Sequence, residues 1–130
     1  MANDSIIDIK EILNDYSSDI QEGIVRITKE VAKEDVTKLK NTKNTYTVRS
    51  GDYNKSWTYK AETKQGTITC IVHNKDHYRL THLLENGHKV IGRDGTVKGQ
   101  TRAFKHIAPV EEESNSTYQR RIEELIRNGG

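Results

Sequence analysis

The sequence predicts an α+β fold, in which helices pack on one small antiparallel sheet. Three observations lead to this class. Apolar residues in the first 39 positions recur at steps of three and four, which is the spacing of one helix face. Two segments in the middle of the chain alternate apolar and polar residues, as strands do. Helical spacing returns near the C-terminus, so helices and strands occupy separate parts of the chain.

Residues 5–39 are predicted to form one long N-terminal helix. Acidic residues follow the same stepping as its apolar residues but two positions later, so they lie on the opposite face. Asp4 or Ser5 can cap its start, and Gly23 is expected to mark a weak point or a bend. The apolar stripe consists of Ile6, Ile9, Leu13, Tyr16, Ile20, Ile24, Ile27 and Val31.

The middle of the chain is predicted to form three or four antiparallel strands. Residues 56–62 and 67–73 alternate on either side of a turn and indicate a hairpin. Tyr46 and Val48 indicate a short extended piece before it. Residues 78–85 fit either a third strand or a short helix, because periodicity alone does not separate the two for so short a run.

A long basic loop, residues 87–102, is predicted to follow, and it contains four glycines. Loops of this length in a compact domain are usually functional or disordered, so we expect this loop to be flexible before assembly. The flanking residues 83–87 and 104–109 are expected to be fixed points anchored in the core. Pro109 then suits the first turn of a closing helix. The apolar stripe of that helix is Tyr118, Ile122, Leu125 and Ile126.

The composition predicts one domain, residues 1–130, with a thin core. Ile, Leu, Val and Phe make up only 28 of the 130 residues, so we expect the chain to gain stability from burial against neighbours. Neither a signal peptide nor an apolar run of membrane-spanning length is found. We therefore expect a soluble protein made in a cytosol.

The net charge of +2 conceals an uneven distribution. Residues 1–37 carry nine acids and four bases, whereas residues 38–78 carry eight bases and three acids. Residues 79–106 carry six bases and two acids. Such a division predicts complementary contacts, either within one chain or between copies.

The sequence offers no catalytic motif, which favours a protein that is not an enzyme and uses no cofactor. The single Cys70 lies on an alternating apolar face and is predicted to be a buried, inert thiol. The histidines fit structural or exposed positions, a metal site, or a catalytic base, but they lack a ligand-like arrangement with acids. They are His73, His77, His82, His88 and His106.

The basic loop is the best functional candidate. Lys89, Arg93, Lys98 and Arg102 are predicted to form an assembly-interface loop that becomes ordered against a protein partner. Two alternatives remain. The loop could be an ordinary solvated surface, or these bases, with Lys105, could contact the phosphates of a nucleic acid.

Three short motifs occur in an order that resembles a family of tailed-phage neck proteins. These are head–tail joining or tail-completion proteins, named after a gene-10 product of a lambdoid siphophage. The chain departs from the family at the third motif, where no proline separates Ala103 from Phe104 and the later pair is reversed. The matching residues are Ser50, Gly51, Tyr53 and Ser56, then Tyr78, Glu85 and Gly87, then Ala103, Phe104, Ala108 and Pro109.

The resemblance implies a structural virion or prophage protein without enzymatic activity. It implies a ring, of six-fold symmetry, between the head connector and the tail terminator or tail tube, with DNA passing through the lumen. It also implies a location at the head–tail interface of the virion.

Overall fold

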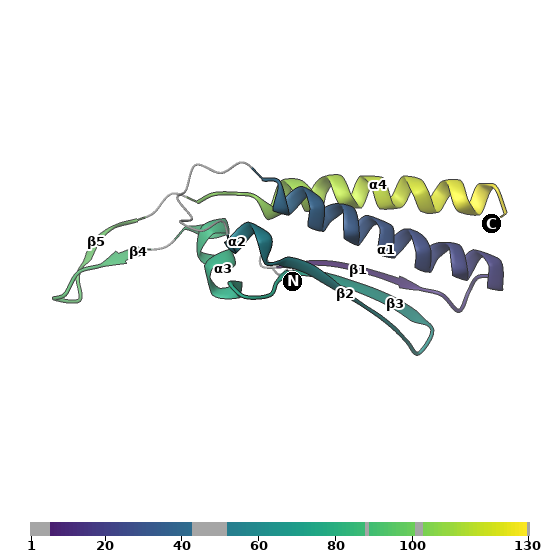
Figure 1. Ribbon diagram of the computed structural model, residues 1–130, viewed down its shortest axis with the longest axis horizontal. Helices are drawn as coiled ribbons and strands as arrows, with labels where there is room; N and C mark the ends of the chain where they lie inside the picture. The colour runs from purple at the N-terminus through teal and green to yellow at the C-terminus, as the bar shows by residue number, and fades with distance from the viewer. Residues whose placement is uncertain (1–5, 43–51, 88, 101–102, 130) are drawn as a thin grey trace.

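The computed structural model describes residues 6–42, 52–87, 89–100 and 103–129 (Figure 1). Its architecture is α+β, with a long helix, a three-stranded antiparallel sheet and a C-terminal helix, as the sequence predicts. The elements in chain order are β1 (Ile7–Ile12), α1 (Ser18–Lys40), α2 (Asp52–Lys55), β2 (Trp57–Lys64), β3 (Thr67–Asn74), α3 (Tyr78–Asn86), β4 (Lys89–Ile91), β5 (Val97–Gln100) and α4 (Ile107–Arg127).

The predicted hairpin of the main sheet is confirmed as β2 and β3, and β3 is the central strand in the order β1-β3-β2. Alternate residues of β3 are buried, including Ile68, Cys70 and Val72. The tight turn that joins the two strands uses Gln65 and Gly66, whose φ angles are +53° and +73°. Such angles favour glycine and match the twist of a two-residue hairpin.

The predicted start of the long helix is wrong, because residues 7–12 form strand β1 and α1 begins only at Ser18. The isoleucines here fit a period of two as well as the helical period, and pairing with β3 satisfies their backbone groups. The N-cap is Ser17, whose hydroxyl accepts from the N–H of Ile20 at 3.4 Å. The caps expected at Asp4 or Ser5, and the extended piece at Tyr46 and Val48, lie outside the described residues.

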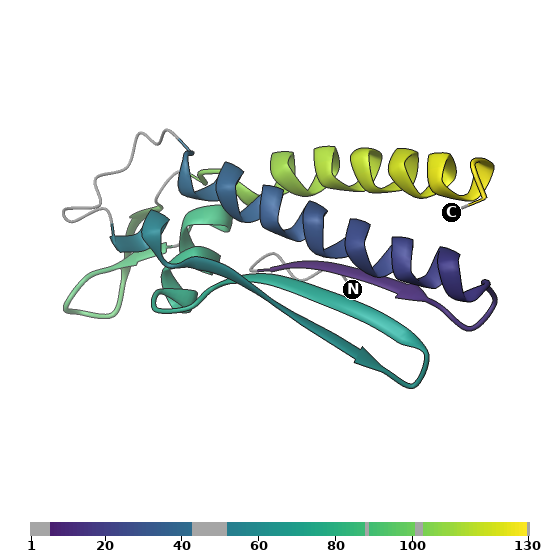
Figure 2. The ribbon, with the colours of Figure 1, turned by 45° about the vertical axis from the view of Figure 1, so that its right-hand side comes forward.

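Helix α1 forms the middle layer, between the sheet and α4 (Figures 1 and 2). Polar contacts between the two long helices show that they run antiparallel: Thr28 meets Tyr118 at 2.9 Å, and Asp35 accepts from Ser114 at 2.6 Å. Gly23 lies inside the continuous α1, where a Cβ atom would come within 2.7 Å of the Leu125 side chain. Its missing side chain therefore admits close packing of α4.

The structure also decides the predictions for residues 78–85 and for the loop 87–102. Residues 78–85 belong to helix α3, not to a third strand. The predicted loop 87–102 contains a second, separate antiparallel hairpin, β4–β5. Helix α4 begins at Ile107 and holds Pro109 in its first turn, where a missing N–H removes no helical bond. Among the described helices, none is long and apolar enough to cross a membrane.

Candidate assembly hairpin and its buried base

The hairpin β4–β5 projects from one end of the elongated molecule, away from the main sheet (Figures 1 and 2). Its two strands pair antiparallel, with Lys89 opposite Gln100 and Ile91 opposite Val97. A bulge shifts the register between Val90 and Ile91. A two-stranded ribbon of this length is only marginally stable by itself in water. Its stability therefore depends on how it is anchored to the domain and on any partner that it binds.

The turn of the hairpin is held by Asp94 and Thr96. The Asp94 carboxylate accepts from the backbone N–H of Thr96 at 3.1 Å and from its hydroxyl at 2.7 Å. These bonds lower the pKa of Asp94. Gly95 completes the turn with a φ of +82°, which an L side chain rarely adopts. The local sequence therefore specifies the hairpin tip.

Three of the four predicted interface residues, Lys89, Arg93 and Lys98, are exposed on this hairpin. Arg102 lies outside the described residues. Lys98 is 3.5 Å from Asp94, an exposed ion pair of little energetic weight. Lys105 is not part of this surface, because its ammonium group donates to the Asn86 side chain at 3.1 Å.

An exposed apolar pair on the hairpin was missed by the sequence reading. Ile91 and Val97 are cross-strand partners on one face of the ribbon, and each is 56% exposed. The sequence carries a signal for the hairpin, because β-branched residues stand on both sides of a turn sequence that contains Gly92 and Gly95, but it does not show that the pair is exposed. The four glycines and several basic residues of this segment favour the prediction of a loop over that of a hairpin.

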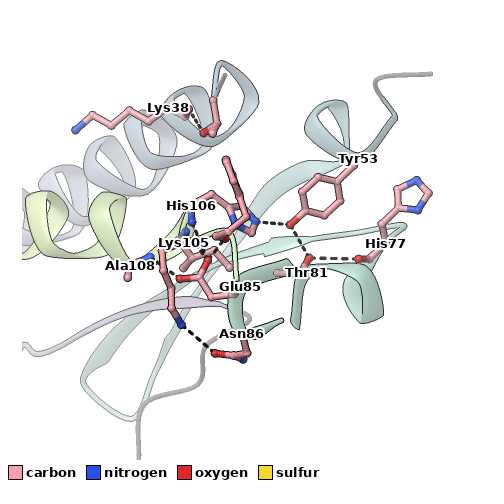
Figure 3. A network of polar contacts seen from close by, with 12 residues as sticks. Lys38, Tyr53, His77, Thr81, Glu85, Asn86, Lys105, His106 and Ala108 are labelled. Carbon is pink, nitrogen blue, oxygen red and sulfur yellow. Dashed lines mark hydrogen bonds and ion pairs between the residues drawn. The ribbon is translucent and has the colours of Figure 1, made fainter. Parts of the chain in front are cut away.

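The two flanks of the hairpin are bonded directly to each other, as expected of fixed points. The backbone N–H of Phe104 donates to the carbonyl of Leu84 at 2.6 Å. The Glu85 side chain, only 2% exposed, reaches the start of α4 and accepts from the N–H groups of His106, Ile107 and Ala108 at 2.9, 2.9 and 3.1 Å (Figure 3). A carboxylate from α3 thus caps α4.

Burial acts to raise the pKa of Glu85, but the hydrogen bonds to its carboxylate outweigh burial. The His106 ring and the three backbone N–H groups together lower this pKa to about 2. A helix N-terminus carries partial positive charge, which also favours the ionised form. Glu85 is therefore charged at neutral pH and holds both ends of the hairpin to the core.

His106 connects this cap to a buried chain of polar groups (Figure 3). Its Nδ1 lies 3.0 Å from Glu85 Oε1 and 2.9 Å from the Phe104 carbonyl, and its Nε2 lies 2.6 Å from the Tyr53 hydroxyl. Tyr53 donates to the Thr81 hydroxyl at 3.1 Å, and Thr81 donates to the His77 carbonyl at 3.2 Å. The carboxylate of Glu85, the His106 ring and the Tyr53 hydroxyl thus form one connected chain of polar contacts.

Aromatic packing completes the base of the hairpin. The ring of Tyr53 meets Trp57 edge-on at 5.9 Å and His106 at 5.7 Å, while Trp57 and His106 are 6.2 Å apart. The cluster joins α2, the start of β2 and the start of α4 in one buried unit. Such a unit orients the hairpin relative to the sheet, although the buried indole N–H of Trp57 has no hydrogen-bond partner among the described residues.

Cys70 and the histidines were the other candidates for a catalytic or metal-binding site, and in the described part of the chain they do not gather into a metal-binding group. Cys70 is fully buried, and burial raises the pKa of its thiol, which confirms the predicted inert thiol. No three His, Cys, Asp or Glu side chains among the described residues gather closely enough to hold a metal ion. His88 and the side chain of His82 are not among the described parts.

Comparison with known proteins identifies one family. A family model described as "Bacteriophage HK97-gp10, putative tail-component" matches residues 7–87, which is more than half of the chain. The match covers β1 through α3, including Tyr78, Glu85 and Gly87 of the second motif. The third motif, around Ala103 and Pro109, lies beyond the matched residues. No curated protein and no solved structure gives a significant match.

Proposed function

The chain belongs to the bacteriophage HK97-gp10-like family of tail components, and we propose that it acts as a single-domain neck or tail-completion subunit. In this role it joins the head connector to the tail. It self-associates into a ring, for which six copies are the proposed number. Membership in a phage tail-component family implies a location in the virion, and we propose the head–tail interface as the specific place.

The observation that carries the proposal is the projecting hairpin, considered together with the family. An exposed pair, Ile91 and Val97, stands beside exposed bases on a ribbon that is held at its base by the buried Glu85. Exposed apolar residues on a projecting element are typical of a protein contact surface. A rigid base with a projecting ribbon suits a subunit that assembles with neighbours.

The proposed action is assembly, not catalysis. The buried Glu85, His106 and Tyr53 at the hairpin base bond to one another or to the backbone, which fits a structural role. The ring stands between the connector and the tail terminator or tail tube, and DNA passes through its lumen. The alternative of a free-standing nucleic-acid-binding protein has no support from the family match.

Native mass spectrometry tests the proposal directly. The purified chain is measured alone and then mixed with the connector, tail-terminator and tail-tube proteins encoded by the same phage or prophage. We expect a mass equal to that of a closed ring of six copies, and a complex of this ring with at least one of these components. A chain that remains monomeric with all three partners contradicts the proposed neck function.

A further inference from the structure

The hairpin at one end of the molecule and the start of α1 at the other end carry opposite charge. One end holds the hairpin β4–β5, whose residues 89–100 contain three bases and one acid. The other end holds the last residues of β1, the start of α1 and the end of α4 (Figure 1). From Glu11 to Val25 the chain contains four acids and no base. We call the segment from Ile12 to Glu22 the acidic end; its exposed residues include Ile12, Asp15, Asp19 and Glu22.

The acidic end presents an apolar side chain as well as charge. Ile12 is 56% exposed, and Asp15, Asp19 and Glu22 are all exposed. The two helices are locked together here by the contact of Leu125 with Gly23, so the surface is supported by packed structure. Bases also lie at this end, because Lys64 stands in the same cross-strand row as Ile12 and Arg127 lies in the last turn of α4. The acidic charge is therefore confined to the segment from Ile12 to Glu22.

We propose that the hairpin β4–β5 of one copy binds the acidic end of a second copy, an inference that rests on the proposed self-association. Ile91 and Val97 supply the apolar contact, with Lys89, Arg93 and Lys98 facing Asp15, Asp19 and Glu22. The contact is between copies, because the two surfaces lie at opposite ends of the elongated chain (Figures 1 and 2).

This contact is heterologous, since each copy offers one hairpin and one acidic end. A heterologous contact closes into a ring when the rotation between neighbours divides a full turn. Charge complementarity orients the encounter and weakens as salt rises, while the aliphatic groups supply contact that salt does not screen. A nucleic acid would match the bases of the hairpin but would leave its apolar pair without a partner.

Reversing the charges of the hairpin or of the acidic end tests the inference, and mixing the two variants should restore binding. The first variant carries Lys89→Glu, Arg93→Glu and Lys98→Glu, and the second carries Asp15→Lys, Asp19→Lys and Glu22→Lys. Each variant alone opposes like charges, and we expect self-association at least ~10-fold weaker in sedimentation at low salt. The mixture restores association, because the reversed hairpin meets the reversed acidic end and the native surfaces meet each other.

The matched control is Lys33→Glu, Lys55→Glu and Lys60→Glu, which changes the charge equally at exposed positions outside both proposed surfaces. It should associate as the wild type does. Circular dichroism verifies that every variant is folded. Two folded variants that both associate normally, or a mixture without rescue, overturn the inference.

Cysteine cross-linking places the contact independently, because the native Cys70 is buried and should not react. A mixture of Val97→Cys and Ile12→Cys chains should form disulfide-linked dimers under mild oxidation, whereas each variant alone should not. Dimers formed by Val97→Cys alone would indicate a hairpin-to-hairpin contact and reject the inference.

The inferred hairpin contact and the proposed neck function can be rejected separately. Variants that associate normally, while wild-type rings still bind the connector or tail proteins, reject the hairpin contact and leave the neck function standing. A wild-type chain that stays monomeric even with its neck partners rejects both.

Discussion

Glu85 in α3 and Ile107 in α4 are joined by a hydrogen bond of 2.9 Å, in which a buried carboxylate accepts the first backbone N–H of the long C-terminal helix. The same carboxylate also accepts from the N–H groups of His106 and Ala108. The hairpin β4–β5 lies between these residues in the sequence. One side chain therefore closes the base of the hairpin and caps a helix.

Replacing Glu85 with alanine should destabilise the fold severely. Three N–H groups, two of them buried, would lose their acceptor, a loss of about 3 kcal/mol or more. Glu85→Gln keeps one acceptor oxygen without the charge and should fall between alanine and wild type. Urea unfolding measures both, with Glu112→Ala at an exposed position of α4 as the control. An alanine variant within ~0.5 kcal/mol of wild type would contradict the capping role.

The same carboxylate predicts a loss of stability in acid. Its pKa is about 2 in the folded chain and near the ordinary 4.5 in the unfolded chain. The unfolded state thus binds the proton more tightly, so the stabilisation is complete above about pH 4.5 and is lost as the pH falls toward 2. Unfolding curves at successive pH values should show this loss in wild type and a smaller one in Glu85→Gln.

Asp35 should have the opposite dependence on pH. Burial between α1 and α4 raises its pKa from 3.8 to about 6, although the hydrogen bond from Ser114 acts against the shift. The folded chain binds this proton more tightly, so the contribution to stability grows as the pH falls from about 6 toward 3.8 and is lost as the pH rises through 6.

Asp35→Asn should therefore be more stable than wild type at pH 7, by on the order of 1 kcal/mol after solvent screening is allowed for. The amide oxygen can still accept from Ser114, and no buried charge remains. Thermal unfolding at pH 7 and pH 5 measures the change. If wild type shows no gain at pH 5 relative to this variant, the buried charge is not the cause.

Tyr53→Phe removes the hydroxyl that joins Thr81 to His106 while it keeps the ring against Trp57. Loss of these buried hydrogen bonds should cost about 1–3 kcal/mol. Tyr59→Phe in β2 is the matched control and should cost less. Equal stability of the two variants would show that the Tyr53 hydroxyl does not support the hairpin base.

Ile91→Thr combined with Val97→Thr should separate assembly from folding. Both side chains are 56% exposed, and threonine retains the preference for strand structure, so the monomer should unfold within ~0.5 kcal/mol of wild type. Self-association should weaken, because the apolar contact is lost. Analytical ultracentrifugation of the double variant measures this. Unchanged association would show that the pair is not an interface.

Part of the candidate site could be read from the sequence. Lys89, Arg93 and Lys98 do lie together on one projecting element, and the residues on either side of it are anchored, as predicted. The exposed pair Ile91 and Val97 could not be chosen as a contact surface, since the sequence does not show whether a β-branched residue is buried. Its exposure depends on the absence of neighbours in three dimensions.

The sequence by itself determined the α+β class, the β2–β3 hairpin and the closing helix. Those elements depend on local periodicity and on turn residues such as Gly66 and Pro109, which act within a few positions of the chain. Only the tertiary structure decided the strand β1 and the cap at α4. Residues 7–12 fit two periods, and pairing with β3 selects the strand. Glu85 meets Ile107 only after the chain between them has folded back, because that contact joins residues distant in sequence.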